Sequence, residues 1–247
     1  MRWLLSPLES TPFLEDIMKL SKRTLDVLKN FAAINENILI KGGGNQIQTI
    51  AEGNSILARA TVEEEFPVDI SFYNLNRFLA LVDKTEPEVS FKPDTAVIET
   101  KYGRDTLRYQ APSTLLLPPG PEKIALIDGL KRVITFDLER DQLSQLLSRS
   151  NIMSVSDVLV TAEEGKLVLR AIDKNKPDTS DKTDITLGDY TGDHEFRFFV
   201  SRDNLKVLPD TYEVSIAKEG HWRFTSKTHD LTYDVASDSK GNYYRAA

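Results

Sequence analysis

The chain has 247 residues, of which 40% are apolar and 28% are charged, and its net charge is −7. This composition is typical of a folded globular protein with one or two domains and excludes an intrinsically disordered chain. The chain has no cysteine, which excludes disulfide bonds, thiolate zinc sites and cysteine nucleophiles. No apolar run reaches about 18 residues, so we expect a cytosolic protein without a membrane partner.

The first helix expected along the chain, at residues 18–35, is amphipathic and basic. It contains one acidic residue, Asp26, against four basic residues, which are Lys19, Lys22, Arg23 and Lys29. An acidic protein binds DNA poorly unless its positive charge is gathered on one surface. The meaning of this helix therefore depends on whether other helices share its charge.

Short strands dominate the rest of the chain. Alternating apolar runs bounded by turn residues predict strands at residues 38–43, 55–62, 88–93, 96–103, 106–112, 195–200, 212–226 and 231–237. Residues 157–174 predict a β-hairpin that turns at Glu163, Glu164 and Gly165. Many antiparallel strands with a few helices predict an α+β chain.

Residues 111–133 interrupt this pattern. Each of their four prolines lacks a backbone N–H donor, so none of them fits a central strand. We interpret this segment as an extended connector between two halves of ordinary domain size; the alternative is one long surface loop. The predicted division is a first domain at 18–112, a connector at 113–133 and a second domain at 134–247.

An apolar pattern recurs four times, twice on each side of the connector. An apolar residue precedes a leucine by five positions, and another apolar residue follows three positions later. The four copies are Leu20, Leu25 and Leu28; Ile70, Leu75 and Phe78; Leu138, Leu143 and Leu146; and Val200, Leu205 and Leu208. Each copy predicts a strand end followed by a short helix with two apolar residues on one face. Ser21, Ser71 and Ser201 are the predicted helix caps, with Glu139 as the exception.

The four predicted helices are less acidic than the rest of the chain. Their balances are +3 for 18–35, +1 for 73–84, 0 for 138–152 and +1 for 201–208, together +5. Because the whole chain carries −7, the remainder carries −12. If the helices share one face of the molecule, that face can attract nucleic acid; the alternative is an ordinary solvated face.

With these segments in this order, the chain resembles the DNA sliding clamps, and it is most similar to the polymerase processivity clamps of T4-like bacteriophages. The resemblance runs from Met18 almost to the C-terminus. The segments that carry it are MKLSKRTLDVLKNFAAIN (18–35), FYNLNRFLALV (72–82), APSTLLLPP (111–119), DQLSQLLSRS (141–150) and the turn ITLGDYTGDHEFRF (185–198).

The resemblance implies a DNA-clamp fold of two similar domains, each with two short helices packed on antiparallel sheets. It also implies a homotrimeric ring around double-stranded DNA in the cytoplasm of an infected bacterial host. The implied partners are the DNA polymerase, an ATP-dependent clamp loader and late-transcription factors. Helices would line the hole and contact phosphates without reading sequence.

Residue by residue, the resemblance assigns nine basic side chains to the DNA-facing surface. They are Lys19, Lys22, Arg23, Lys29, Arg77, Arg140, Arg149, Arg202 and Lys206. Leu115, Leu116 and Leu117 are candidate walls of a pocket for partner peptides, or else are buried between the two domains. Edge strands of adjacent protomers would form the trimer contacts.

Residues 1–17 lie outside the family pattern. One interpretation is that Met18 is the ordinary initiator and that this segment comes from an upstream start. The other is that Trp3, Leu4, Phe13 and Leu14 form a docking segment.

The sequence predicts no catalytic residue, metal site or cofactor. The three histidines, His194, His221 and His229, form no compact ligand motif, and Gly42–Gly44 lack the Lys-Ser/Thr of a phosphate-binding loop. Two alternatives to a ring remain. One is a monomeric processivity factor that grips DNA, and the other is a β-rich phage structural or adaptor protein that binds no DNA.

Overall fold

The computed structural model describes residues 17–82, 88–237 and 240–246. Its strands form four sheets in which all strand pairs are antiparallel. Helices pack beside these sheets, and the predicted α+β composition is confirmed.

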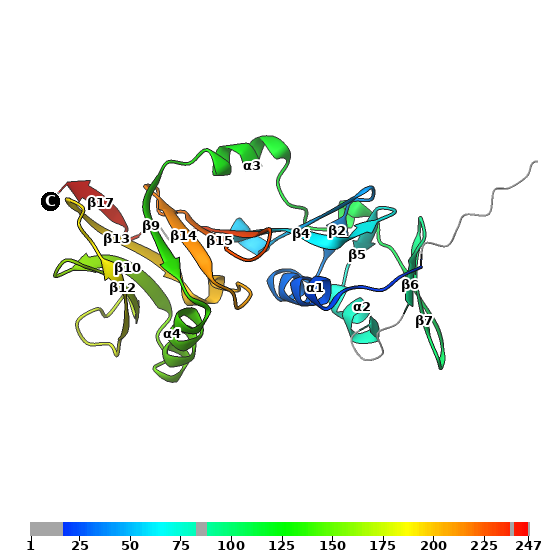
Figure 1. Cartoon of the computed structure of the whole chain (residues 1–247), viewed down its shortest axis with the longest axis horizontal. Coiled ribbons are helices and arrows are strands. Elements are labelled where there is room, and N and C mark those ends of the chain that lie inside the picture. The colour runs from blue at the N-terminus through cyan, green and yellow to red at the C-terminus, as the bar shows by residue number, and fades with distance from the viewer. Residues whose placement is uncertain (1–16, 83–87, 238–239, 247) are drawn as a thin grey trace, which may run out of the picture.

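Two of the sheets lie at opposite ends of the molecule (Figure 1). The first end sheet has the order β1 (Ile17–Met18), β6 (Glu88–Phe91), β7 (Thr95–Thr100) and β8 (Gly103–Arg108). The second end sheet has the order β12 (Thr183–Asp189), β11 (Lys166–Ile172), β10 (Asp157–Glu163), β13 (His194–Ser201) and β17 (Tyr243–Ala246). A small sheet pairs β2 (Ile38–Ile40) with β5 (Ile70–Phe72).

The central sheet crosses the predicted division between the two domains. Its order is β3 (Gly44–Ile50), β4 (Ile56–Phe66), β16 (Leu231–Val235), β15 (Trp222–Ser226), β14 (Tyr212–Ala217) and β9 (Arg132–Leu138). Strand β4 of the first half pairs with β16 of the second half, from Ile56 opposite Val235 to Ala60 opposite Leu231. One continuous hydrophobic core accordingly includes Phe31 and Phe78 from the first half and Phe198 from the second.

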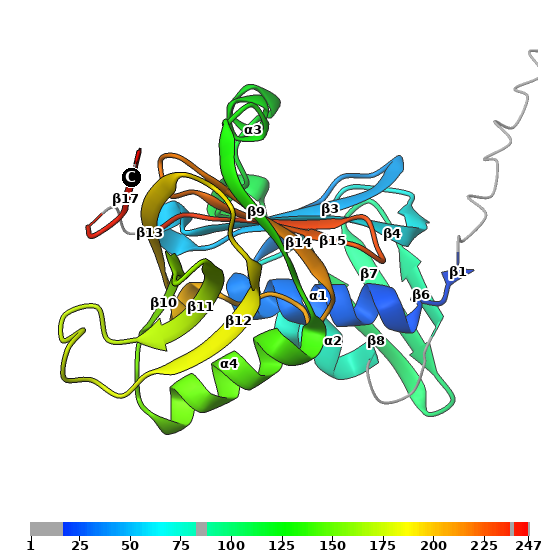
Figure 2. The same ribbon diagram turned by 60° about the vertical axis from the view of Figure 1, so that its left-hand side comes forward.

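The helices lie on two sides of the central sheet (Figures 1 and 2). One side, here called the helix side, carries α1 (Lys22–Ile34), α2 (Leu75–Val82) and α4 (Arg140–Ile152). The opposite side, the connector side, carries α3 (Pro121–Asp128). Short 3₁₀ turns occur at Glu52–Asn54, Pro112–Thr114 and Arg202–Asn204.

The fourfold apolar pattern identifies the core positions of the helices. Leu28, Leu75, Phe78, Leu143 and Leu146 are buried, because residues three or four positions apart share one helix face. The prediction of a fourth helix at 201–208 is wrong, since only the 3₁₀ turn Arg202–Asn204 forms there. Pro209 follows at once and disfavours helical geometry at the preceding residue. Leu205 is still buried, so the pattern reports burial correctly there without a helix.

The predicted caps are confirmed only for the first helix. The Ser21 hydroxyl accepts a hydrogen bond from the Thr24 backbone N–H at 3.2 Å. Ser71 lies inside β5, and its hydroxyl donates to the Gln110 carbonyl at 2.6 Å. Asn74, directly before α2, accepts from the Arg77 N–H at 3.1 Å in its place. Ser201 forms no side-chain cap.

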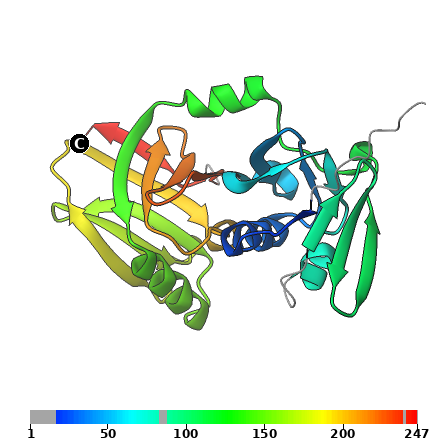
Figure 3. The same cartoon turned by 45° about the vertical axis from the view of Figure 1, so that its right-hand side comes forward.

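The connector is not extended throughout, because residues 121–128 form α3. Pro121 is the first residue of this helix, where the missing N–H would have no intrahelical partner in any case. The prediction of an extended connector is therefore wrong for residues 121–128, whereas the prediction that Pro121 lies outside a central strand is confirmed. Figure 3 shows α3 as a separate helix above the sheet.

Two local turns also bear on the sequence predictions. The β10–β11 hairpin is confirmed, with positive φ angles at Glu164 and Gly165 that suit a two-residue hairpin turn. The segment 185–198 is mostly strand, since it ends β12 and begins β13.

Ile17, placed outside the family pattern with residues 1–16, pairs in β1 with Ser90. The proposed docking residues, Trp3, Leu4, Phe13 and Leu14, lie outside the described residues.

Candidate nucleic-acid interface

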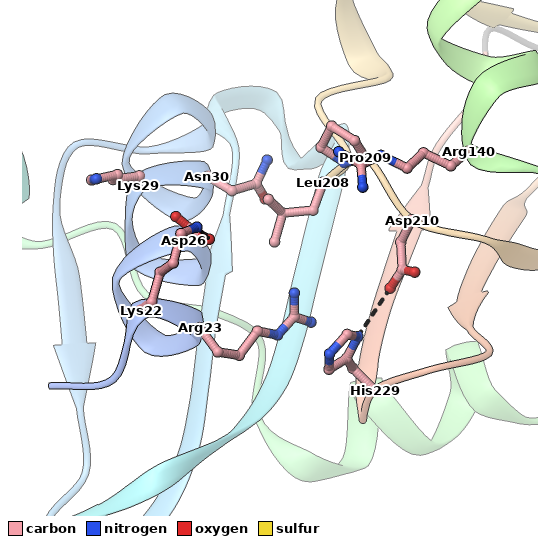
Figure 4. Close-up of a pocket in the computed structure, with 10 residues that line it drawn as sticks. All are labelled: Lys22, Arg23, Asp26, Lys29, Asn30, Arg140, Leu208, Pro209, Asp210 and His229. Carbon is pink, nitrogen blue, oxygen red and sulfur yellow. Dashed lines mark hydrogen bonds and ion pairs between the residues drawn. The ribbon is translucent and has the colours of Figure 1, made fainter.

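A cleft of about 840 Å³ opens on the helix side, where the first half meets the second (Figure 4). Helix α1 forms one wall, and the segment before β14, the turn before β16 and the start of α4 form the other. We call it the seam cleft; its lining residues are Lys22, Arg23, Asp26, Lys29, Asn30, Arg140, Leu208, Pro209, Asp210 and His229.

Four of the nine basic residues predicted to face DNA line this single cleft. Lys22, Arg23 and Lys29 come from α1, and Arg140 is the first residue of α4. Lys22 pairs with Asp26 one helical turn later, with 2.6 Å between the ammonium and the carboxylate. The fold thus brings together basic residues that lie more than 100 positions apart in the sequence.

Three other predicted residues are exposed but lie apart from the cleft. Lys19 precedes α1, and Arg149 lies in the last turn of α4. Arg77 on α2 lines a smaller cavity of about 210 Å³ together with Phe72 and Leu107.

The two remaining residues, Arg202 and Lys206, bind the protein's own backbone. The Arg202 guanidinium donates to the Val155 carbonyl at 3.0 Å and also pairs with Asp203. The Lys206 ammonium donates to the Ala33 carbonyl at 2.9 Å, near the end of α1. Because these donors are already engaged, both residues are weaker candidates for phosphate contact than sequence reasoning assumed.

The arginines differ in ion pairing between the two sides of the molecule. On the helix side, Arg23, Arg77, Arg140 and Arg149 form no ion pair with the described part of the chain. On the connector side and the end sheets, most arginines are matched with carboxylates; examples are Arg59, Arg104, Arg170, Arg223 and Arg245. Arg108 on β8 and Arg197 on β13 form no ion pair with the described residues. Most of the unmatched guanidinium groups therefore lie beside the helices, and a surface of this kind attracts polyanions.

Sequence reasoning missed the His229–Asp210 pair in the seam cleft. The His229 Nδ1 lies 3.2 Å from an Asp210 carboxylate oxygen, which also accepts hydrogen bonds from Ser226 and Thr228. Burial would raise the pKa of the Asp210 carboxyl, but the hydrogen bonds outweigh burial and lower that pKa. No local motif signals this pair, because its members lie 19 residues apart on separate turns.

The connector leucines lie in different environments. Leu115 is buried, whereas Leu116 and Leu117 are 36% and 40% exposed. None of them lines the cavity of about 560 Å³ that lies between α3 and the central sheet. Its apolar lining includes Ile124 of α3 and Ile47 of β3. A pocket beside the connector is therefore present, but its walls are not the three predicted leucines.

Asp128, the last residue of α3, ties the connector to the sheet. Its carboxylate accepts hydrogen bonds from Arg59 of β4 at 2.8 Å and from Arg223 of β15 at 2.6 Å. Beneath it, the buried Asp234 carboxylate lies 3.0 Å from Arg59 and 2.7 Å from Arg223. One arginine–aspartate network therefore joins the connector, the first half and the second half.

We expect this attachment to weaken in acid. The Arg59 hydrogen bond, followed by the one from Arg223, lowers the pKa of Asp128 below its ordinary value of about 3.9. A lowered pKa in the folded state adds stability above the unfolded-state pKa, and this stability is lost as the pH falls through the folded-state value. Urea unfolding at about pH 6 and about pH 3 measures this effect. The free energy of unfolding of Asp128→Asn should fall less between these two pH values than that of the parent protein.

Asp178→Asn is the matched control, because Asp178 is an exposed carboxylate without an ion pair in the described chain. This control should lose as much stability as the parent. Equal pH dependence in Asp128→Asn and the parent would contradict the assigned role of Asp128.

The described residues contain neither a metal-ligand cluster nor a membrane-spanning helix. No group of three or more His, Cys, Asp or Glu side chains there could hold a metal ion. None of the helices in this part of the chain combines the length and the apolar character that a bilayer crossing needs.

Comparison with known proteins places residues 135–239 in the family model described as gp45 sliding clamp, C terminal. The chain is 31% identical over 224 residues to the sliding clamp of Vibrio phage KVP40, covering 90% of this chain and 100% of that relative. It is 29% identical over 235 residues to the sliding clamp of Enterobacteria phage T4, covering 92% of this chain and 100% of that relative.

Solved structures show the same fold at low sequence identity. PCNA of A. fulgidus, bound to the C-terminal region of FEN-1, matches with a TM-score of 0.65 and 13% identity, covering 90% of this chain and 97% of that chain. The Helicobacter pylori beta clamp bound to a DNA ligase peptide matches with a TM-score of 0.64 and 12% identity, covering 90% of this chain. The present chain spans 65% of the length of that bacterial clamp.

Proposed function

Because this chain belongs to the sliding-clamp family of T4-like bacteriophages, we propose that it encircles duplex DNA and tethers the replicative DNA polymerase during processive synthesis. It acts as a homotrimeric ring in the cytoplasm of the infected host and performs no catalysis. Residues 18–112 and 134–247 serve as its two clamp domains, and residues 113–133 connect them.

The observation that carries this proposal is the unmatched arginine charge on the helix side. Arg23, Arg77, Arg140 and Arg149 offer guanidinium groups that no carboxylate of the described chain neutralises. Such groups attract backbone phosphates without reading bases. With the acidic surplus elsewhere, the helix side is the surface that would face DNA in a ring.

The arrangement of the end sheets supports head-to-tail assembly. Strand β8 is a free edge of the first end sheet, and β12 is a free edge of the second, at the opposite end of the molecule. Strand β8 carries Arg104, Asp105 and Arg108, whereas β12 carries Asp184 and Asp189, so their net charges are +1 and −2. Pairing of unlike edges between protomers is a heterologous contact, which closes into a ring when the rotation fits.

The implied partners follow from the family. The cavity between α3 and the central sheet is a candidate site for polymerase and other partner peptides; its outer wall is the connector helix. In the solved structure of PCNA from A. fulgidus, the bound partner segment is the C-terminal region of FEN-1. An ATP-dependent clamp loader places the ring on DNA, and late-transcription factors also bind it.

The solution mass tests the ring directly. Light scattering from high to sub-micromolar concentration should detect a species near three times 27.9 kDa. Arg108→Glu on β8 should shift the protein toward the monomer, because it places a carboxylate opposite an acidic edge. A strict monomer at every concentration would favour a DNA-gripping processivity factor instead.

DNA binding separates a clamp from an adaptor protein. A clamp of this charge should bind short open-ended duplexes weakly and with strong salt dependence. If the protein forms no complex with duplex DNA even at low salt and does not stimulate the polymerase, the adaptor alternative is favoured.

A further inference from the structure

The seam cleft is assembled from four separate segments and is open to solvent. Its volume of about 840 Å³ lies in the range of sites that hold drug-sized ligands, about 300–1,000 Å³. The cleft therefore has room for a stretch of sugar–phosphate backbone. Figure 4 shows α1 on one side and the Asp210–His229 pair on the other.

The charges of the cleft do not cancel. Asp26 is matched by Lys22, and Asp210 is engaged by Ser226, Thr228 and His229. Neither carboxylate lies within ion-pair distance of Arg23 or Arg140. The cleft therefore presents two guanidinium groups whose planar donors suit bidentate binding of phosphate.

His229 is oriented toward the same space. Its Nδ1 faces Asp210 at 3.2 Å and the Thr228 hydroxyl at 2.6 Å, so Nε2 is the nitrogen left for a ligand. In Figure 4 the Arg23 side chain extends across the cleft toward the imidazole ring. A protonated imidazole beside this guanidinium would repel it unless an anion lay between them.

We propose that the seam cleft is a pH-dependent binding site for a backbone phosphodiester of duplex DNA, held by Arg23, Arg140 and His229. This inference rests on the proposed function, and it adds a specific phosphate contact and a residue that sequence reasoning did not assign. A phosphodiester is a monoanion with two free acceptor oxygens, which matches guanidinium donors on one side and an imidazolium N–H on the other.

The direction of the pH dependence follows from the number of N–H donors that the His229 ring can offer. A neutral His229 with its proton on Nδ1 offers only an acceptor at Nε2, whereas the protonated ring donates from both nitrogens. The other charged groups facing the cleft are Lys22, Arg23, Asp26 and Lys29 on α1, Arg140 on α4, and Asp210. Among these side-chain types, histidine is the one whose charge ordinarily changes within the range of about pH 5 to 8. Affinity for DNA should therefore rise as the pH falls through that range.

The test compares His229→Gln with the unmodified full chain. Glutamine keeps a side-chain donor for Asp210 but cannot gain a proton. The probe is a short fluorescent duplex at low salt, with binding followed by anisotropy between about pH 5.5 and pH 8. For the unmodified protein we expect affinity to rise roughly five- to tenfold toward acid pH, the gain from one charge-assisted hydrogen bond. His229→Gln should lose this rise.

His194→Gln is the matched control. His194 also pairs with an aspartate, Asp193, at 2.7 Å, but it lies in the second end sheet, outside the seam cleft. This variant should keep the full pH dependence. Dimethyl phosphate in place of DNA provides a second probe, because it is a phosphodiester monoanion whose charge does not change in this range. Tight binding of this small anion with the same pH dependence would indicate a free-anion site and overturn the assignment to a DNA backbone.

The outcomes separate the two proposals. Loss of the pH dependence in His229→Gln alone supports the cleft. An unchanged pH dependence in His229→Gln, with DNA binding retained, overturns the cleft proposal and leaves the clamp function standing. Failure of the unmodified protein to bind DNA at any pH overturns the cleft proposal, and it overturns the clamp function as well if the protein also fails to stimulate the polymerase.

Discussion

Asp234→Asn should lower the free energy of unfolding by about 3 kcal/mol, because it removes the buried carboxylate that Arg59 and Arg223 share and leaves them only Asp128. The Asp234 side chain is only 1% exposed and lies within ion-pair distance of Arg59 and Arg223. Arg132 is 3.9 Å from the same carboxylate. The three arginine side chains are partly exposed and can move toward water, which places the expected loss at the lower end of the range for broken buried pairs. Urea unfolding followed by circular dichroism measures this loss.

Asp137→Asn provides the matched control for this experiment. Asp137 also pairs with a cation from another strand, Lys227 at 2.5 Å, but its side chain is 60% exposed. Such a surface pair contributes about 0–1 kcal/mol, so the control should unfold almost as the parent does. Similar losses in both variants would show that burial of Asp234 has no special importance.

Removing both guanidinium groups of the seam cleft should weaken DNA binding strongly. For the double variant Arg23→Gln and Arg140→Gln, we expect the slope of log affinity against log salt to fall by about two, because each phosphate contact contributes about 0.9 to that slope. Clamp-dependent stimulation of the polymerase on a primed circular template should fall with it. The trimer mass should not change, since neither residue lies on an end sheet.

A control with the same change in charge uses Arg197→Gln and Lys131→Gln. Both side chains are exposed and lie outside the seam cleft, and neither forms an ion pair with the described chain. This control should keep the parent's salt slope. An equal reduction of the slope in both double variants would indicate that binding depends on net charge alone.

The sequence was informative wherever burial follows a local period. Leu28, Phe78 and Leu146 were predicted to face the core from spacing alone, and all three are buried. The strand runs were recognised for the same reason, since alternation marks strands that bury one face.

The errors arose where tertiary contacts or a single proline decide the local structure. Pro121 was assigned to an extended connector but begins α3, and the fourth repeat forms only the 3₁₀ turn Arg202–Asn204 before Pro209. Ser71 is of a residue type that often caps helices, but its hydroxyl donates a hydrogen bond to the backbone carbonyl of Gln110, 39 residues away. No local pattern distinguishes these outcomes.

The sequence predicted the kind of site, a basic surface on the helices, but not the full set of residues that form it. The basic bias of the helices directed attention to Arg23 and Arg140, which line one cleft. The fold brings His229 to the same cleft, and it places Arg202 and Lys206 against backbone carbonyls. Contacts between segments far apart in the sequence leave no local pattern.

The pairing of β4 with β16 has a mechanical consequence. Strands from the two halves form one continuous ladder from Ile56–Val235 to Ala60–Leu231, and the Arg59–Asp234 ion pair crosses the same junction. Bending the protomer at this junction would require backbone hydrogen bonds and a buried charge pair to break together. The chain is therefore stiff at this junction, and a ring built from such chains would open at a joint between subunits.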